Sequence, residues 1–315
     1  MLYDGTNRVY VAGEKNSGRK TLISSIMHQF AFNAVWSDGN QWELSPMGKN
    51  AEMLEGAQLL EKKMTALDRI RVFDIEKITA DSGCKVPDFA DLGLFINNEV
   101  CGRIYFTNIT GKQEDMKILS EYMFSIILIV ADCNEILRNN TEYIGRLSAK
   151  LEKAVNACGE KPRVVFALTK ADMIPEDMKN NDFAQLYQLF EKNAQELVSY
   201  CMKNAIIHEK RAVCALNKST HEIFAKDGSL LSEPNFQPWE VDRLLVDIIS
   251  LSVPLTRMRL GNIIDRCNDI RMRRRGVFSL ESIRAQLVLR MARKNLCTTI
   301  RNICPLDNAM KYIGR

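Results

Sequence analysis

Residues 11–23 read VAGEKNSGRKTLI, a short apolar strand candidate that passes through a glycine-containing turn into a helix candidate. Gly13 and Gly18 have the spacing of a phosphate-binding loop, G-x-x-x-x-G. In such a loop, successive backbone N–H groups and the N-terminus of the helix hold an anion together. The sequence therefore predicts a phosphate site. Its candidate residues are Gly13, Asn16, Ser17, Gly18, Arg19, Lys20 and Thr21.

Strand and helix candidates alternate along most of the chain. Two strand candidates, 124–131 and 163–168, are continuous apolar runs, the pattern of strands that are covered on both faces. The other strand candidates are 8–12, 92–97, 103–107 and 211–216, and the helix candidates are 21–30, 141–158, 182–202 and 239–251. This alternation predicts an α/β fold with a doubly wound, mostly parallel sheet whose ligand lies at the carboxyl ends of the strands.

The chain divides into two predicted domains of opposite charge. Residues 253–315 contain 14 Lys and Arg against 4 Asp and Glu, a net charge of +10, which leaves −6 for residues 1–252. The first part is the predicted α/β domain, with an insertion at about residues 31–91 in which Met47–Ala66 is predicted as an amphipathic helix. The second part is a predicted basic helical extension, in which Ser279–Arg301 reads as a helix.

The basic extension leaves several kinds of partner open. Arg271–Arg275 (RMRRR) is a compact run of charge, and the helix predicted after it is amphipathic and basic. In one interpretation its apolar face docks on the α/β domain. In the others, the segment 271–301 binds an acidic protein partner, a nucleic acid or a membrane surface. Aromatic side chains are not interleaved with the arginines, which disfavours nucleic acid.

Composition narrows the class of protein. The 315 residues are 46% hydrophobic and 26% charged, which is typical of a globular chain and excludes disordered and collagen-like classes. The apolar runs are too short to span a bilayer, so we expect a cytoplasmic protein. Nine cysteines without a C-x-x-C pair predict reduced thiols and argue against a zinc ribbon. The three histidines have no metal-ligand spacing.

A second motif follows the apolar strand candidate 163–168. Residues Thr169, Lys170, Ala171 and Asp172 spell TKAD, which fits the T/N-K-x-D pattern that selects guanine. A carboxylate accepts two hydrogen bonds from the N1–H and the exocyclic amine of guanine, and adenine offers no such pair. We therefore expect Asp172 to recognise the base, the stem of Lys170 to lie along the base plane, and the ligand to be GTP or GDP.

Two weaker matches follow other strand candidates. Asn108 to Gly111 (NITG) comes directly after 103–107, in the place of a D-x-x-G switch whose Asp faces magnesium and whose Gly N–H senses a γ-phosphate. Ala215 and Leu216 resemble a loop whose backbone N–H contacts guanine O6. These matches add Asn108 and Gly111 as switch residues, and Ala215 and Leu216 as guanine-binding residues.

Together these motifs resemble the P-loop GTPases of the Ras-like and translation-factor class over residues 8 to about 251. Within that class the sequence GEKNSGRKTL, the insertion and the C-terminal extension are most similar to the bacterial double-GTPase group or to a dynein-light-intermediate-chain-like offshoot. The resemblance implies a loop lysine on the β and γ phosphates, a neighbouring Ser or Thr on Mg²⁺, an acid that supports the metal through water, and a Gln that orients the attacking water.

The departures from that family pattern concern the metal and the attacking water. Arg19 replaces the lysine, Lys20 replaces the metal-binding hydroxyl, and Asn108 replaces the acid. Lys112 stands where the catalytic Gln often lies, and Gln113 comes one residue late. An ammonium group repels Mg²⁺ instead of binding it, so Mg²⁺ is doubtful and we expect neither metal-ligating nor catalytic residues.

Three functions remain open at this point. The leading one is a regulatory guanine-nucleotide-binding protein with impaired or absent hydrolysis, acting as a switch, a scaffold or a partner subunit, with another GTPase among its conceivable protein partners. The second is a slow active GTPase. An alternative register supports it, in which Lys20 and Thr21 are the K-T of the loop, although Glu14 and Arg19 then occupy both glycine positions. The third is a nucleotide-free protein-interaction module on a GTPase-like fold.

Overall fold

The fold is taken from a computed structural model. The structure describes residues 6–31, 35–37, 39–46, 88–111, 119, 123–158, 160–179, 183–219, 222, 225, 231, 235, 237–272 and 303–313. Among the described residues, none of the helices is long and apolar enough to cross a membrane.

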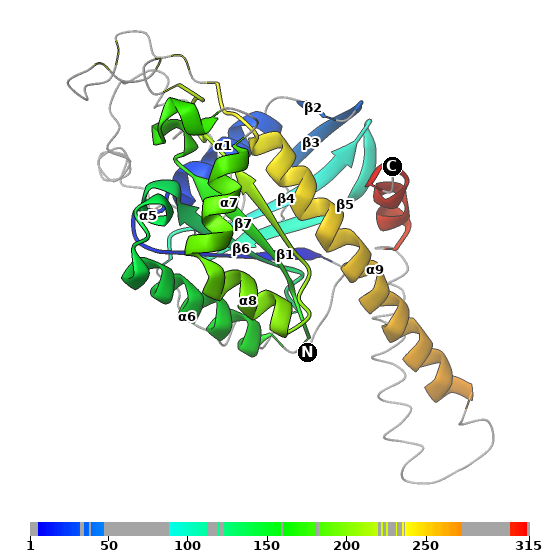
Figure 1. Ribbon diagram of the computed structural model, residues 1–315. Coiled ribbons are helices and arrows are strands. Elements are labelled where there is room, and N and C mark those ends of the chain that lie inside the picture. The colour runs from blue at the N-terminus through cyan, green and yellow to red at the C-terminus, as the bar shows by residue number, and fades with distance from the viewer. Residues whose placement is uncertain are drawn as a thin grey trace.

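An eight-stranded sheet forms the centre of the described chain, with the strand order β2-β3-β4-β5-β1-β6-β7-β8 (Figure 1). The strands are β1 (Asn7–Gly13), β2 (Val35–Ser37), β3 (Asn40–Pro46), β4 (Phe89–Ile96), β5 (Glu99–Thr107), β6 (Ile126–Asp132), β7 (Arg163–Thr169) and β8 (His208–Ala212). Strands β5, β1, β6, β7 and β8 are parallel neighbours, whereas β2, β3, β4 and β5 pair antiparallel. The predicted fold class is confirmed as a doubly wound, mostly parallel α/β sheet.

Helices cover both faces of this sheet (Figure 1). They are α1 (Arg19–Ala31), α5 (Cys133–Leu137), α6 (Thr141–Ala157), α7 (Ala184–Asn193), α8 (Gln195–Lys203) and α9 (Val241–Met272), with short 3₁₀ turns η1 (Ala171–Met173) and η2 (Glu176–Lys179) and a further helix at 303–313. The sequence predicts one helix over 182–202, but the chain forms two, because Ala194 has φ −101° and ψ 34° and interrupts the helical hydrogen bonds.

The side chains of β1 alternate between two hydrophobic cores, one on each face of the sheet. Val9 and Val11 belong to the core that α1 and α9 cover, and Tyr10 and Ala12 belong to the core that α5 to α8 cover. Successive side chains of a strand point to opposite faces, so one strand serves both cores. Strand β6 is buried along its whole length, as its unbroken apolar run predicts.

Strands β2 and β3 are not expected from the sequence, and they lie within the predicted insertion at about residues 31–91. They extend the sheet beyond β4 through antiparallel pairing. In β3, Trp42 and Leu44 lie two residues apart on one face and are both fully buried in the core that includes α1. The helix predicted for Met47–Ala66 lies outside the described residues.

Helix α9 is longer than the helix predicted for 239–251. It continues through Pro254 to Met272, so it spans the predicted domain boundary between residues 252 and 253. Leu260 in its middle belongs to the same core as α1, and Arg259, only 2% exposed, donates a hydrogen bond to the carbonyl of Phe124 at 2.9 Å. That residues 253–315 form a separate basic extension stays a prediction.

The helix at 303–313 also packs on the sheet domain. Leu306 and Ala309 are buried in the core shared with α1 and α9, and the Asn308 side chain donates to the carbonyl of Val100 at 3.2 Å. The predicted helix at Ser279–Arg301 and most of the basic run before it lie outside the described residues.

Candidate functional site

A compact loop joins β1 to α1 at the carboxyl end of the sheet. A Cβ atom on Gly13 would lie 2.6 Å from the carbonyl oxygen of Val130, so the loop leaves β1 through a position that excludes any side chain. Gly18 has φ +88°, a conformation that glycine adopts without strain. Its carbonyl accepts the hydrogen bond from Leu22 N at 2.8 Å that opens α1, and Ser17 N donates to Glu14 O at 3.2 Å.

The first turn of α1 carries cations and no acid. Arg19, Lys20 and Thr21 are its first three residues. Positive charge at a helix N-terminus opposes the helix dipole, so this arrangement favours an anion nearby. The Arg19 side chain passes Gly13, where a Cβ added to the glycine would lie 3.3 Å from the Arg19 Cδ. Its guanidinium lies against Gly111 so closely that a Cβ there would clash. Arg19 thus connects the loop with the predicted switch.

The predicted switch residues form a tight turn after β5. Asn108 is 4% exposed with φ 61°, and its Nδ2 donates to the carbonyl of Val11 at 2.8 Å. The Gly111 N–H donates to Asn108 O at 3.2 Å. The Asn108 Oδ1 atom is buried without a hydrogen-bond partner in the described chain, and buried acceptors of this kind are generally satisfied by a water or a ligand.

An acid that the sequence analysis missed holds this turn. Asp88 directly precedes β4, and its Oδ1 accepts hydrogen bonds from Thr110 N at 2.8 Å and Thr110 Oγ1 at 2.6 Å. The carbonyl of Asp88 also accepts from Ile109 N at 3.1 Å. The pairing of β4 with β5 brings Asp88 next to the turn after β5. The residues that flank Asp88 in the sequence do not indicate that it belongs to the site.

The TKAD segment is attached directly to the phosphate loop. Thr169 is 2% exposed at the end of β7, and its Oγ1 lies 2.6 Å from the carbonyl oxygen of Ser17 and 3.0 Å from that of Ala131. A Cβ on Gly18 would lie 3.6 Å from the same Oγ1. The structure therefore brings together the predicted phosphate residues and the first predicted guanine residue.

Lys170 follows with a left-handed backbone, φ 58°. Its Nζ lies 2.6 Å from Oδ2 of Asp132, the last residue of β6. The other carboxylate oxygen of Asp132 accepts from Asn134 N at 2.9 Å and so caps α5. Asp132 is a second residue that sequence reasoning missed, although an acid that ends a fully buried strand is a usable signal.

Asp172 lies in the η1 turn, largely enclosed by protein. Burial raises the pKa of its carboxyl to about 6, although its own backbone N–H and the charges of Lys179 and Lys170 act in the opposite direction. Lys179 is 8% exposed and donates from Nζ to the carbonyl of Asp172 at 2.8 Å. Since burial penalises an unpartnered carboxylate, donors such as those of guanine would stabilise its charged form.

The loop that contains Ala215 and Leu216 lies beside the TKAD segment. Val213 N donates to Leu168 O at 2.8 Å, and Ala171 N donates to Val213 O at 3.4 Å. Both predicted residues are half-buried. The ends of β7 and β8 therefore place all the predicted guanine residues at one edge of the sheet.

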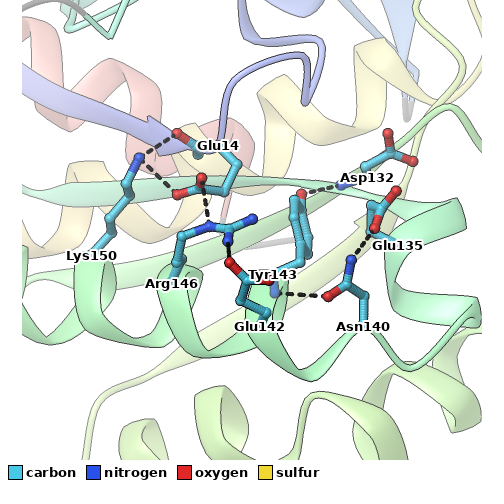
Figure 2. A network of polar contacts seen from close by, with 9 residues as sticks. Glu14, Asp132, Glu135, Asn140, Glu142, Tyr143, Arg146 and Lys150 are labelled. Carbon is cyan, nitrogen blue, oxygen red and sulfur yellow. Dashed lines mark hydrogen bonds and ion pairs between the residues drawn. The ribbon is translucent and has the colours of Figure 1, made fainter.

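Helix α6 adds two cations that were not predicted for the site (Figure 2). Lys150 Nζ lies 2.8 Å from Glu14 Oε1 and 3.2 Å from Gly13 O, and Arg146 Nε lies 3.1 Å from Glu14 Oε2. Burial of Glu14 raises the pKa of its carboxyl, but Lys150 and Arg146 together outweigh it, and the net shift is downward. Glu14 is therefore ionised at neutral pH. The i, i+4 spacing of Arg146 and Lys150 is the signal that places both on one face.

The described residues do not fit the Mg²⁺ ligand set that the family resemblance implies. Lys20 occupies the position of the hydroxyl ligand, and Asn108 directs its amide nitrogen to a main-chain carbonyl where an acid would stand. In the described ranges there is no group of three His, Cys, Asp or Glu side chains that would hold a metal. Lys112 and Gln113, the candidates for the water-orienting position, lie outside those ranges.

Comparison with protein-family models gives no match, and comparison with curated proteins gives none either. Among solved structures, two mutation variants of SsGBP are similar at 16% identity with a TM-score of 0.35, covering 69% of this chain. The matched part spans 53%, about half, of the SsGBP chain.

Two further solved structures are similar to this chain at lower identity. One is the signal recognition particle receptor SRb-GTP/SRX complex from Chaetomium thermophilum, at 9% identity, TM-score 0.33, with 67% of this chain and 92% of that chain covered. The other is sup35 complexed with GDP, at 10% identity, TM-score 0.33, with 67% and 37% covered. At such TM-scores these likenesses carry no functional argument, and the function below rests on the geometry of the chain.

Proposed function

We propose that this chain is a guanine-nucleotide-binding regulatory protein whose hydrolysis is impaired or absent. One observation carries the proposal: Thr169 Oγ1 lies 2.6 Å from Ser17 O. This contact joins the phosphate-type loop to the TKAD segment. A loop suited to phosphate and a carboxylate suited to guanine therefore lie within one continuous site at the carboxyl edge of the sheet.

The guanine end of the site has one acid placed for base selection. Asp172 presents a mostly buried carboxyl whose pKa is raised to about 6 by burial, so further donors would stabilise its charged form. Guanine supplies two N–H donors to such a group, whereas adenine supplies none in that arrangement. In this proposal the half-buried Ala215 and Leu216 would contact the base through backbone N–H groups.

The phosphate end of the site relies on side-chain positive charge. Arg19 and Lys20 begin α1, and Lys150 approaches the loop from α6 to within 3.2 Å of Gly13 O. These cations can neutralise bound phosphate, but a fixed cation does not bridge the β and γ oxygens as Mg²⁺ does. Binding without efficient hydrolysis is the expected result, which suits a switch, a scaffold or a subunit of a larger assembly.

The proposal is tested by isothermal titration of the full chain with GDP, GTP and ATP, each with Mg²⁺ and with EDTA. We expect both guanine nucleotides to bind, ATP to bind at least about tenfold more weakly, and EDTA to change each affinity by less than about threefold. Asp172→Asn should lose the preference for guanine, and Asp177→Asn, an exposed neighbour, should keep it. Equal affinity for ATP and GTP would contradict the role of Asp172.

One observation favours a second candidate, a nucleotide-free interaction module. The Lys170 ammonium is already bound to Asp132 at 2.6 Å, and the Gly111 N–H is already bound to Asn108 O. Both groups are thus occupied by the protein itself. Denaturing the purified protein and identifying what it releases distinguishes the two candidates. A guanine nucleotide supports the first, and no nucleotide, with no thermal shift on adding one, supports the second.

A further inference from the structure

A cavity of about 250 Å³ lies between the phosphate loop and α6. Its floor is β1, one wall is the turn that contains Asn108, and the opposite wall is α6. The guanine-end residues Thr169, Lys170 and Asp172 do not line it. The cavity therefore opens beside the phosphate loop, on the side away from the expected base.

The size of the cavity suits a small organic molecule. A dry engineered cavity of about 150 Å³ accepts benzene, and one water has a share of about 30 Å³ in the liquid. About 250 Å³ therefore holds an aromatic ring together with a charged group, and it exceeds what a single inorganic anion needs.

The described lining combines an apolar floor with basic side chains. Tyr10 and Ala12 on the floor are 4% and 3% exposed and belong to the core beneath α6. Among the described residues, the cations that line the cavity are Arg19, Arg146, Lys150 and Lys153, and the acid is Glu14. Glu14 is already paired with Lys150 and Arg146, as Figure 2 shows. Arg146 also pairs with Glu142, so among the described α6 cations at the cavity Lys153 is the one that no acid neutralises.

Two further groups define what the cavity would bind. Lys153 lies on its α6 wall, and among the described residues no acid lies within ion-pair distance of its ammonium group. On the opposite wall, Asn108 is 4% exposed and its Oδ1 is a buried acceptor without a partner in the described chain. A ligand with an anionic group at one end and an O–H or N–H donor at the other would satisfy both.

We propose that this cavity is a binding site for a small aromatic anion, a ring that bears a carboxylate or a phosphate. The ring rests on Tyr10 and Ala12, and the anionic group lies beside Lys153 on the α6 wall. Arg19 lines the cavity and also lies at the phosphate loop. A ligand in either place would therefore contact the same side chain. The site does not require that guanine nucleotide binds.

The test is isothermal titration of the full chain, without nucleotide, with phenyl phosphate and with 4-hydroxybenzoate. Benzyl alcohol, which has the ring without the charge, and inorganic phosphate, which has the charge without the ring, are titrated in parallel. We expect at least one aromatic anion to bind about tenfold or more tightly than either of these. Whichever probe binds identifies the phosphate or the carboxylate as the preferred group.

Two variants test whether the probe binds within the cavity. Ala149→Phe adds a ring at the exposed α6 rim of the cavity, and Lys153→Glu reverses the charge beside it. Each variant should weaken binding of the aromatic anion about tenfold. Lys192→Glu makes the same charge change on the outer side of α7 and should alter affinity less than about twofold. Thermal unfolding shows that each variant is folded, and Ala149→Leu replaces the Phe variant if it is not.

The outcomes separate this inference from the proposed function. If neither aromatic anion binds, or if binding survives both Ala149→Phe and Lys153→Glu, the cavity is not the site and the inference is wrong. If inorganic phosphate displaces the probe with equal affinity, the probe lies in the phosphate loop, and the inference is again wrong. A failure of GDP to bind would count against the proposed function alone, because no arm of this test contains nucleotide.

Discussion

The side-chain amide of Asn108 donates a hydrogen bond of 2.8 Å to the main-chain carbonyl of Val11, 97 residues away in the sequence. The contact ties the turn after β5 to the central strand directly beneath the phosphate loop. It also explains why an amide stands where the D-x-x-G pattern has an acid, since a carboxylate has no hydrogen to donate to a carbonyl.

Replacing Asn108 with Asp should therefore destabilise the protein. The change removes a buried donor and places two carboxylate oxygens beside the carbonyl of Val11, at a position only 4% exposed. We expect a loss of about 3 kcal/mol in the free energy of unfolding, measured with urea. Asn98→Asp, at an exposed position with a similar backbone, should change it by less than about 0.5 kcal/mol. Recovery of the lost stability on adding Mg²⁺ would contradict our view that the site does not fit this metal.

The hydroxyl of Thr169 offers a second test, at the join between the loop and the TKAD segment. Thr169→Val keeps the volume but removes the group that lies 2.6 Å from Ser17 O. We expect a loss of about 1–2 kcal/mol in stability and weaker GDP binding, because the carbonyl is left buried without its donor. Thr169→Ser retains the hydroxyl and should bind GDP like the unchanged protein. Equal behaviour of the Val and Ser variants in calorimetry would show that this contact does not organise the site.

Guanine binding should depend on pH through Asp172. Burial raises the pKa of this carboxyl to about 6, and only its charged form accepts both guanine donors. GDP affinity should therefore fall about fivefold between pH 6 and pH 5, with little change between pH 7 and pH 8. Asp172→Asn should bind GDP weakly and without this slope in titration calorimetry. A flat profile for the unchanged protein would mean that another group recognises the base.

Asp172 should also affect the pH dependence of folding stability, in the direction opposite to that of a salt-bridged acid. Because its pKa in the folded chain lies above the value of 3.8 for a solvated Asp, folding is favoured by protonation, and stability falls as pH rises from about 4 to about 6. Above pH 6, Asp172→Asn should thus be more stable than the unchanged protein, by about 1–3 kcal/mol in urea unfolding. A loss of stability at pH 8 would contradict the raised pKa.

Glu14 provides the fifth prediction, because it places a negative charge at the second position of the phosphate loop. Its carboxylate pairs with Lys150 at 2.8 Å and Arg146 at 3.1 Å, both partly exposed, so the pairs contribute little to stability. Glu14→Gln should cost less than about 1 kcal/mol in unfolding, yet it should strengthen GDP binding about threefold or more by leaving both cations to the phosphates. Glu142→Gln, the exposed partner of Arg146, is the matched control. Weaker binding in Glu14→Gln would show that the carboxylate positions the loop.

The features that the sequence predicts are those set by local pattern. The buried runs of β6 and β7, the glycines of the phosphate loop and the TKAD segment each follow from neighbouring residues, and the parallel order of the strands brings their carboxyl ends to one edge. Asp88 and Lys150 belong to the site through contacts across the fold, with Thr110 and Glu14 respectively. Such pairings have no local signal. Strands β2 and β3 were missed for a related reason, since Trp42 and Leu44 alternate over too few residues to be distinguished from a loop.

The course of α9 affects how the chain can be shortened. Its 32 residues correspond to a rod about 48 Å long, and its N-terminal half is anchored by Arg211, which contacts Asp247, and by Arg163, which donates to Leu251 O at 2.7 Å. A truncation after residue 252 would remove Arg259 and Leu260 from the protein interior and expose the surface that they cover. Expression clones that end beyond residue 313 keep the buried anchors seen among the described residues, and a label on the distal turns of α9 would report any tilt of the rod as a large displacement.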